Sequence, residues 1–509
     1  MKSKIKNIII TFLLLICCTF TLVGCTNTNN TIMDIARQNG LNCIKSSKDY
    51  NSSNNNTNTV PSTTINVTNN NSNIDLNETY NALVTNGYSG SFSDFLKEYV
   101  FKDYSSTTST EYAVNKSLLS VVSIVAEFHT YSYTITSSGI QTSLSQKTPY
   151  VSMSAGSGVV YTINKTDGSA YIITNFHVIY LSNGITNNYN YIKSDEGDGC
   201  IAKNIYCFMY GTNAKITDTK TTDENGFTIY NAGASAIKCE YVGGSADYDI
   251  AVLKVTDESK DLIKNSNLSA VNIKNSTEIT VGEQAIVIGN PEADGISATI
   301  GIVSVDSEYI QMTNAKNKSV ASRVIRIDAA VNGGNSGGGL FDIDGKLMGI
   351  VNAKIVSDEV ENIGYAIPAD IATAVADRII KYCNNSTNKQ IKKASLGIYL
   401  KSIYSSAVYN GIKAEIKETI AIDSINTGSI AEGKFEANTV ISQIIISSTN
   451  SDGTTFQKTI DVTRMYTVVD SSLYLNVGDT ITFKLKDLEG NSLEDVTITI
   501  TEEAFITID

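Results

Sequence analysis

The sequence has no excess of positive charge, and this limits the classes of function open to it. Its 509 residues carry 39 Lys and Arg against 52 Asp and Glu, a formal net charge of −13 at pH 7. A protein that grips a phosphate backbone needs a basic surface, so we expect no nucleic-acid partner. Charged residues make up only 18% of the chain and hydrophobic residues 42%, which argues against a charged disordered protein and permits a β-rich globular one.

The sequence also lacks the cysteine pattern of a metal site or a disulfide scaffold. Three of its eight cysteines (Cys17, Cys18 and Cys25) lie in the N-terminal apolar segment or at its end, and the other five show no CxxC spacing. The chain has only two histidines. An odd number of cysteines without a histidine cluster argues against structural zinc, so we expect no metal. A bridge between Cys200 and Cys207 across a hairpin and two free thiols are both open at this point.

Only one stretch is apolar enough to enter a bilayer, which excludes a membrane bundle. Lys2, Lys4 and Lys6 precede an apolar run over Ile8–Val23, the layout of an export signal. The run ends in Leu22-Val23-Gly24-Cys25, which resembles the lipobox of bacterial lipoproteins, where the cysteine is diacylated and becomes the first residue. The alternative is an ordinary cleaved signal with an incidental cysteine. We therefore expect residues 1–24 to be a lipoprotein signal peptide and the mature chain to be extracytoplasmic, anchored to the cell membrane through Cys25. The many Asn, Lys and Ile residues favour a Gram-positive setting.

The length predicts two or three folded units. Residues 25–75 include a tract of Asn, Ser and Thr over Asn51–Asn73 and are predicted to be a flexible tether. Over Leu76–Val100, apolar residues recur at helical spacing on both sides of Asn86–Gly90, so residues 76–104 are predicted to form a helical hairpin. This segment is similar to a short module found repeatedly in Gram-positive surface proteins.

Residues 105–388 are predicted to form a β-barrel domain. Short apolar runs such as Ser120–Val125 and Tyr171–Ile173 are separated by Gly, Asn and Asp. The clearest helix, Ala369–Tyr382, lies where this domain would end. The stretch Leu181–Glu240 is rich in Asn, Tyr and Gly and predicts enlarged loops that shape or cover a cleft.

Three segments of this domain carry the residue types of nucleophilic catalysis. His177 follows an apolar strand, Asp249 opens another, and Ser336 lies in the segment Asn332-Gly333-Gly334-Asn335-Ser336-Gly337-Gly338-Gly339. Taken singly, these fit a structural histidine, a strand-edge aspartate and a flexible turn. Together they supply a nucleophile, a base and the carboxylate that fixes the tautomer of the base. His177 precedes Asp249 by 72 residues and Asp249 precedes Ser336 by 87, and this chain order is that of the chymotrypsin fold.

The glycines beside Ser336 predict an oxyanion hole. A tight turn there lets the N–H groups of Gly334 and Ser336 point at one spot, and the predicted hole comprises Gly334, Asn335 and Ser336. Asn335 carries no charge and therefore cannot pair with a freshly cut N-terminal amine. We expect other contacts to hold this loop in order.

The region from Ser120 to Ala369 resembles the trypsin-like protease domain of the HtrA/DegP family. Besides the three segments above, the resemblance is carried by Gly156-Ser157-Gly158-Val159, Val281-Gly282-Glu283, Ile288-Gly289-Asn290-Pro291, Gly301-Ile302-Val303-Ser304, Asp328-Ala329-Ala330 and Gly364-Tyr365-Ala366-Ile367-Pro368. It implies a mainly β fold of two six-stranded barrels with the active site between them, cofactor-free peptide hydrolysis and, often, a homotrimer. Gly333 and Gly339 depart from it, because the family commonly has proline at both places.

The resemblance also indicates specificity. Ala330, six positions before the nucleophile, would lie at the base of the pocket for the side chain that precedes the cut bond. No carboxylate stands there, so the pocket is expected to accept small apolar side chains and to reject Lys and Arg.

Residues 389–509 are predicted to be a second β-rich domain, with strands at Ala421–Ile425, Val440–Ile446, Thr480–Leu485 and Val496–Ile500. Leu396-Gly397-Ile398 and the segments after it are similar to a PDZ domain. The resemblance implies that Leu396, Gly397 and Ile398 offer backbone N–H groups to the C-terminal carboxylate of a peptide.

These observations predict a membrane-anchored, extracytoplasmic serine endopeptidase that acts on unfolded or damaged envelope proteins. One alternative is a catalytically weak relative that serves as a peptide-binding or chaperone module. Another is a surface scaffold that works through the helical hairpin.

Overall fold

The computed structural model describes residues 42–43, 65–66, 76–85, 88–90, 109–136, 139–140, 147–186, 190–195, 197–212, 216–353, 363–384, 386, 389–409, 411, 413–449 and 453–508. The chain divides into two compact units, Met1–Thr107 and Thr108–Asp509. The predicted signal peptide and Cys25 lie outside the described residues. Among the helices that are described, none has the length and apolar character needed to cross a membrane.

In the first unit, helix α3 (Leu76–Thr85) confirms the first helix of the predicted hairpin. The Tyr80 hydroxyl donates to the carbonyl of Gly90 at 3.0 Å, and its ring packs edge-on against Tyr88. The second predicted helix lies outside the described residues. Two short strands, β1 (Asn42–Cys43) and β2 (Ile65–Asn66), pair antiparallel within the predicted tether.

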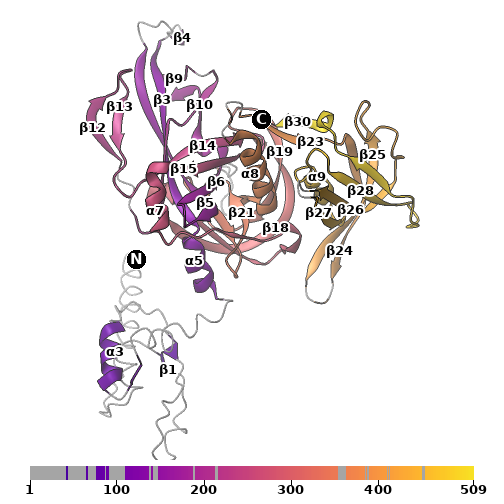
Figure 1. The fold of residues 1–509 in the computed structure, drawn as a ribbon, viewed down its shortest axis with the longest axis horizontal. Coiled ribbons are helices and arrows are strands. Elements are labelled where there is room, and N and C mark those ends of the chain that lie inside the picture. Colours follow the sequence, from indigo (N-terminus) through magenta and orange to yellow (C-terminus); the bar gives the residue numbers. More distant parts are fainter. Residues whose placement is uncertain are drawn as a thin grey trace, which may run out of the picture. The chain divides into compact units, whose positions relative to one another are not determined.

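The second unit begins with helix α5 (Thr110–Leu118) and a closed β-barrel (Figure 1). Its six strands in order of pairing are β3 (Val121–Thr136), β5 (Thr148–Asn164), β6 (Ser169–Thr174), β15 (Ile250–Val255), β14 (Ile237–Ser245) and β11 (Asn204–Met209). Strand β11 pairs back with β3 and closes the barrel. Runs of Val and Ile favour these strands because branched side chains pack well on a pleated sheet.

A second barrel follows along the chain. Its strands in order of pairing are β17 (Gln284–Gly289), β18 (Ser297–Thr313), β19 (Ser319–Ile327), β22 (Gly364–Pro368), β21 (Lys346–Val351) and β20 (Gly339–Phe341). Strand β20 pairs with β17, which closes this barrel, and β16 (Asn272–Ile273) adds to β21 in parallel. The predicted chymotrypsin-like double barrel is confirmed.

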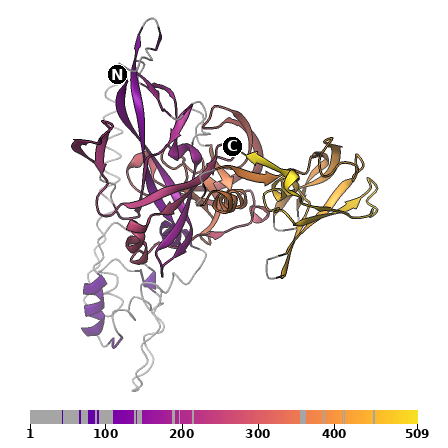
Figure 2. The same ribbon diagram turned by 45° about the horizontal axis from the view of Figure 1, so that its top comes forward.

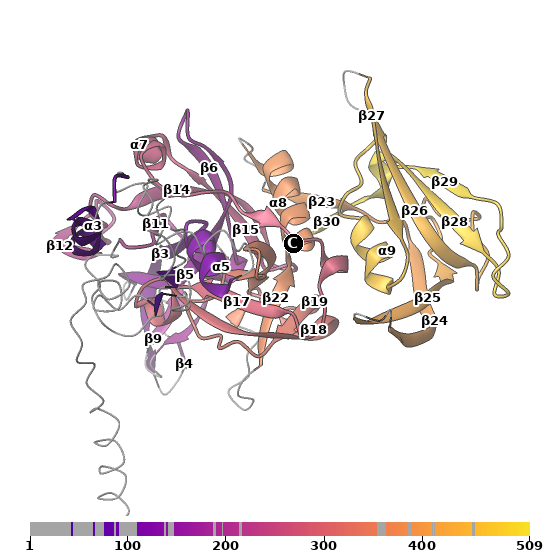
Figure 3. The ribbon, with the colours of Figure 1, turned by 90° about the horizontal axis from the view of Figure 1, so that it is seen from below.

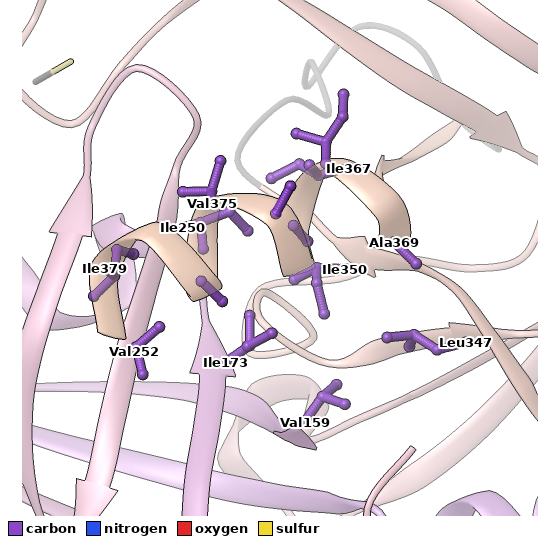
Figure 4. Packing of buried hydrophobic residues seen from close by; sticks show 14 of the residues in the cluster. Val159, Ile173, Ile250, Val252, Leu347, Ile350, Ile367, Ala369, Val375 and Ile379 are labelled. Atoms are coloured by element: carbon purple, nitrogen blue, oxygen red, sulfur yellow. The ribbon is translucent and has the colours of Figure 1, made fainter. Parts of the chain in front are cut away.

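Helix α8 (Ala369–Cys383) packs across both barrels. Figure 4 shows Val375 and Ile379 of this helix next to Ile250 and Val252, which belong to β15 of the first barrel. Ile350 of the second barrel lies beneath the same helix. All five side chains are buried. A shared apolar core of this kind fixes the barrels against each other, and with them any site that both contribute to.

The region between His177 and Asp249, for which the sequence predicts enlarged loops, contains several short strands. It holds β7 (Tyr180–Ser182), β8 (Gly184–Thr186), β9 (Asn190–Lys193), β10 (Gly199–Ile201), β12 (Thr217–Thr222) and β13 (Thr228–Asn231). Strands β3 and β5 run on beyond the first barrel (Figure 2), where β9 and the short β4 (Gly139–Ile140) pair with β3. Phe227, from the β12–β13 connection, stacks on His129 at 4.4 Å.

The C-terminal residues form a separate sheet with its own core. Its strands are β24 (Ile398–Tyr409), β25 (Ala414–Ile425), β26 (Val440–Thr449), β28 (Thr480–Lys486) and β29 (Val496–Thr499), with β27 (Thr455–Asp461) paired to β26 and helix α9 (Met465–Ser471) between β27 and β28. Strands β23 (Ile391–Ala394) and β30 (Phe505–Ile508) lie between α8 and this sheet (Figure 3). The remaining helical segments are α7 (Lys260–Lys264), η4 (Asp257–Ser259), η5 (Ser276–Glu278), η6 (Pro291–Ala293) and η8 (Glu502–Ala504).

Two buried arginines link the C-terminal sheet to the second barrel and α8. Arg378 donates to the carbonyls of Leu473 and Lys392, each at 2.8 Å, and to that of Leu475. Arg323 lies 2.7 Å from Asp470 of α9. Charged groups are costly to bury unless they are paired or hydrogen-bonded. Separation of the C-terminal sheet from the second barrel and α8 would therefore leave both arginines with fewer partners.

Arg323 serves two carboxylates, since it also lies 3.2 Å from Asp370 of α8. Burial raises the pKa of Asp470 from 3.8 to about 6, because the nearby Asp370 adds to the cost of burial and Arg323 only partly offsets it. The folded chain therefore binds this proton more tightly than the unfolded chain does. Between those two pKa values, the contribution of Asp470 to stability falls as the pH rises, and it is most favourable below the lower value.

Asp470→Asn should therefore gain stability relative to the wild type as the pH is raised from about 4 to 7, because the amide has no charge to bury. Thermal unfolding of both proteins across this range measures the difference. Asp423→Asn, a change at an exposed carboxylate on β25, is the control. A difference in melting temperature that does not vary with pH would contradict the prediction.

The structure distinguishes between the two arrangements left open for Cys200 and Cys207, a disulfide bridge and two free thiols. Cys200, Cys207, Cys239 and Cys383 are all buried free thiols. Cys200 lies on β10 and Cys207 on β11, which belong to different sheets. The sulfur nearest to Cys207 is that of Cys239, at 3.6 Å on the neighbouring strand β14. Of the two arrangements left open by the sequence, the structure therefore has the free thiols and not the Cys200–Cys207 bridge. No group of metal-binding side chains is found in the described part of the chain.

Candidate active site

His177 and Asp249 form a hydrogen-bonded pair at the end of the first barrel. His177 lies in the single-turn helix α6 (Phe176–Ile179), which follows directly on β6. Its Nδ1 is 2.7 Å from Oδ2 of Asp249, and its backbone N–H donates to Oδ1 at 2.9 Å. A carboxylate accepts here, so the ring proton is assigned to Nδ1, which leaves Nε2 free to act as a base.

The backbone of Asp249 is held in an uncommon conformation. Its φ of 51° lies in the left-handed region, which costs free energy for a residue with a side chain and persists only where the surroundings impose it. Its carbonyl accepts from the side-chain amide of Asn175 at 2.9 Å and from the N–H of Phe176 at 3.2 Å. Both donors come from the segment that carries His177. The backbone and the side chain of Asp249 are therefore both held against this segment, which orients the carboxylate toward the imidazole.

Asn352 and Ala353 connect Asp249 with Ser336. The Asn352 side chain donates to Oδ2 of Asp249 at 2.8 Å, and the N–H of Ala353 donates to the Ser336 hydroxyl at 3.1 Å. These two residues follow β21 directly. The structure thus places the three predicted catalytic residues in one region, and Ser336 and Asp249 are 95% or more buried. No hydrogen bond joins His177 to Ser336 within the described residues; such bonds often tighten only when substrate binds.

Asn352 is a candidate functional residue that the sequence alone does not reveal. A strand followed by an asparagine is too common a pattern to reveal it, and its role depends on the closure of the second barrel. Asn352→Ala removes a hydrogen bond to a buried carboxylate, so we expect kcat/KM on a chromogenic peptide to fall by about 10- to 100-fold. Steady-state kinetics measure this. A loss below about twofold would mean that Asp249 needs no support from this side.

The three residues of the predicted oxyanion hole differ in the hydrogen bonding of their N–H groups. Gly334 has a φ of 94°, and a Cβ added there would lie 2.2 Å from the carbonyl oxygen of Asn290, so only glycine fits. No acceptor is assigned to the N–H of Gly334 or of Ser336 within the described residues. The prediction was wrong for Asn335, because its N–H donates to the carbonyl of Asn332 at 3.1 Å and is used up in the turn.

The other predicted residues near the loop are placed as follows. Ala330 is exposed, and its carbonyl accepts from the Thr299 hydroxyl at 2.8 Å; its role in specificity stays a prediction. Gly333 has open space around its Cβ position, whereas Gly339 lies in β20, where a Cβ would meet the ring of Phe341. Gly339 lacks the backbone restraint that a proline would give, but close packing against Phe341 restrains it instead.

Part of the chain is similar to known serine proteases. Residues 156–350 match the model of the trypsin-like peptidase domain. The chain is 25% identical over 356 residues to the serine protease Do-like HtrA of Lactococcus lactis subsp. cremoris (strain MG1363), an alignment that covers 67% of this chain and 73% of the relative. It is 28% identical over 287 residues to the protein of the same name from Bacillus subtilis (strain 168), covering 55% of this chain and about half (51%) of the relative.

A solved structure, the HtrA-type protease AlgW with decapeptide, is similar with a TM-score of 0.41 and 22% identity, and the match covers 77% of this chain and 98% of that one.

Proposed function

We propose that this trypsin-like serine endopeptidase is anchored outside the cytoplasm through a lipidated Cys25 and cuts unfolded or damaged envelope proteins. The observation that carries the proposal is the hydrogen-bonded arrangement of His177, Asp249 and Asn352 beside the buried Ser336. The relatives named above are serine proteases. The export signal and the long Asn/Ser/Thr-rich tether of the sequence support a position outside the membrane.

In the proposed mechanism, Ser336 Oγ attacks the carbonyl carbon of the substrate while Nε2 of His177 takes its proton. Asp249 holds the imidazole in the required tautomer and stabilises the imidazolium that forms. The N–H groups of Gly334 and Ser336 donate to the oxyanion of the tetrahedral intermediate. His177 then gives its proton to the leaving amine, and water releases the acyl group by the same steps in reverse order.

The C-terminal sheet supports peptide binding in the manner of a PDZ domain. Strand β24 is at the edge of its sheet and pairs only with β25 among the described strands, so a peptide can add to its other side. Gly397, with a φ of 72°, turns the chain into β24, while Leu396 and Ile398 pack against the core of the sheet. We propose that these three residues receive the C-terminal carboxylate of a substrate. The homotrimer implied by the family resemblance is part of the same proposal.

The pocket prediction follows from the proposed reaction. With Ala330 at its base, the pocket should favour Val, Ala or Leu before the cut bond over Lys or Arg by about 100-fold in kcat/KM, since an unpaired charge is costly to bury. A library of tetrapeptide substrates that differ only at this position measures the preference. Efficient cutting after Lys or Arg would show that another residue forms the base.

Digestion of casein tests the activity directly. The fragment from Ser105 to the C-terminus should degrade it, and the same fragment with Ser336→Ala should not. Binding of casein without cutting by both proteins would favour the alternative function, a peptide-binding or chaperone module.

A further inference from the structure

The side chain of Ser157 lies between the nucleophile loop and the segment that supports it. Ser157 is in β5 and is fully buried. Its hydroxyl donates to the carbonyl of Gly334 at 2.8 Å and accepts from the N–H of Asn290, also at 2.8 Å. Its own N–H donates to the carbonyl of Ser336 at 2.8 Å. Ser157 belongs to the first barrel, whereas Gly334, Ser336 and Asn290 belong to the second.

Peptide planarity shows what these contacts do to the oxyanion hole. In a trans peptide, the C=O and the N–H point in opposite directions, so fixing one aims the other. The carbonyl of Gly333 accepts from the N–H of Glu292 at 2.8 Å, which turns the N–H of Gly334 the other way. The carbonyl of Asn335 accepts from Gly338 at 2.9 Å and does the same for the N–H of Ser336.

The peptide that joins Gly334 to Asn335 connects these two donors, and its carbonyl is held by Ser157. Rotation of this peptide would turn the N–H groups of Gly334 and Ser336 relative to each other. The hydroxyl of Ser157 is the donor that meets this carbonyl. It therefore acts on the angle between the two donors without touching the substrate.

The same hydroxyl also holds the supporting segment. Asn290, whose N–H it accepts, leads into Glu292 and Ala293, which have φ values of 54° and 62°. Two successive residues with side chains in the left-handed region are strained and need outside contacts to persist. Glu292 supplies the N–H that fixes Gly333, so Ser157 supports both peptides that flank Gly334.

We propose that Ser157 is a positioning residue for the oxyanion hole. Because Asn335 is uncharged, it cannot hold the nucleophile loop in order through an ion pair with an N-terminal amine, and the hydroxyl of Ser157 orders the loop instead. The proposal rests on the peptidase activity proposed above. Without the hydroxyl, the N–H of the buried Asn290 lacks this acceptor and the carbonyl of Gly334 lacks this donor, and the loop relaxes to conformations that satisfy them in other ways.

Ser157→Ala should lower kcat on a small chromogenic peptide by about 10- to 100-fold and leave KM within about threefold. This fall in kcat should not exceed the fall caused by removal of one oxyanion donor. Affinity for a peptide aldehyde, which forms an oxyanion on Ser336, should fall by the same factor as kcat/KM. Affinity for the peptide product, which forms none, should not change. If Ser157 contributed only to stability, the folded variant would keep the wild-type kcat and the wild-type ratio of aldehyde affinity to product affinity.

The matched control is Thr174→Val. The Thr174 hydroxyl is also fully buried and donates to Ser157, but to its carbonyl, at 2.7 Å. This variant should retain kcat within about threefold even if its melting temperature falls. Equal losses of kcat in both variants, or a wild-type kcat in a folded Ser157→Ala, would overturn the proposal.

If Ser157→Ala does not fold, Ser157→Cys takes its place, since a thiol has similar shape and is a weak donor. A lower kcat with KM retained would support the proposal, and a wild-type kcat would overturn it. Lack of activity in the wild-type chain would instead overturn the proposed function and this inference with it. An active wild type beside an equally active Ser157 variant overturns the inference alone.

Discussion

Ser336→Ala will lower the turnover of a peptide substrate by about 10⁴- to 10⁶-fold, and His177→Ala will lower it by a similar factor. The two changes remove the nucleophile and its base, which act as a unit, so the double variant should be no worse than either single one. Turnover of a fluorogenic peptide by the purified fragment from Ser105, corrected for spontaneous hydrolysis, measures all three variants.

Ser120→Ala is the control for loss of a buried serine hydroxyl. Ser120 is buried in the same unit, and its hydroxyl is 3.1 Å from that of Ser269, away from the catalytic residues. This variant should keep nearly full activity. If Ser336→Ala retained more than a few per cent of wild-type turnover, Ser336 would not be the nucleophile. Additive losses in the double variant would mean that His177 and Ser336 do not act together.

Asp249→Asn should lower turnover by about 10⁴-fold with the fold unchanged. The side-chain amide has nearly the shape of the carboxylate, but its NH₂ group can donate to Nδ1 and thus place the ring proton on Nε2, where it blocks proton uptake from Ser336. The effect should be larger than that of Asn352→Ala, because Asn352 acts only through Asp249. Thermal unfolding and the fluorogenic peptide assay together separate loss of activity from loss of structure.

Asp247→Asn is the matched control for this change. Asp247 lies two residues earlier in the chain and accepts from the side chain of Asn314 at 3.1 Å, not from His177. It should retain activity within a few fold. Wild-type rates in Asp249→Asn together with a large loss in Asp247→Asn would transfer the third catalytic role to Asp247.

The candidate catalytic residues could be identified in the sequence because their types and chain order are informative, and the structure places them in one region. Few side chains can act as nucleophile, base and orienting carboxylate, and the glycines beside Ser336 mark a turn that other residues cannot form. Asn352 and Ser157 were different. Their roles depend on which carbonyl or carboxylate the fold brings to them, and neither an asparagine after a strand nor a serine within one indicates that.

The correction at Asn335 and the choice between the two cysteine arrangements have a similar cause. The position of Asn335 between Gly334 and Ser336 predicts a third oxyanion donor, but the direction of an N–H depends on the peptide plane, which the sequence does not specify. A bridge between Cys200 and Cys207 would require that β10 and β11 form a hairpin. In the structure these strands belong to different sheets, and Cys207 lies closest to Cys239 because β11 pairs with β14.

The most direct test of the account is covalent labelling with a fluorophosphonate, which reacts with a serine only when a base activates it and an oxyanion hole receives the developing charge. Digestion and mass spectrometry of the labelled wild-type fragment should locate one label, on Ser336, and the folded His177→Ala variant should remain unlabelled under the same conditions. Absence of the label from Ser336 in a folded wild-type chain, or equal labelling of Ser336 without His177, would contradict the account.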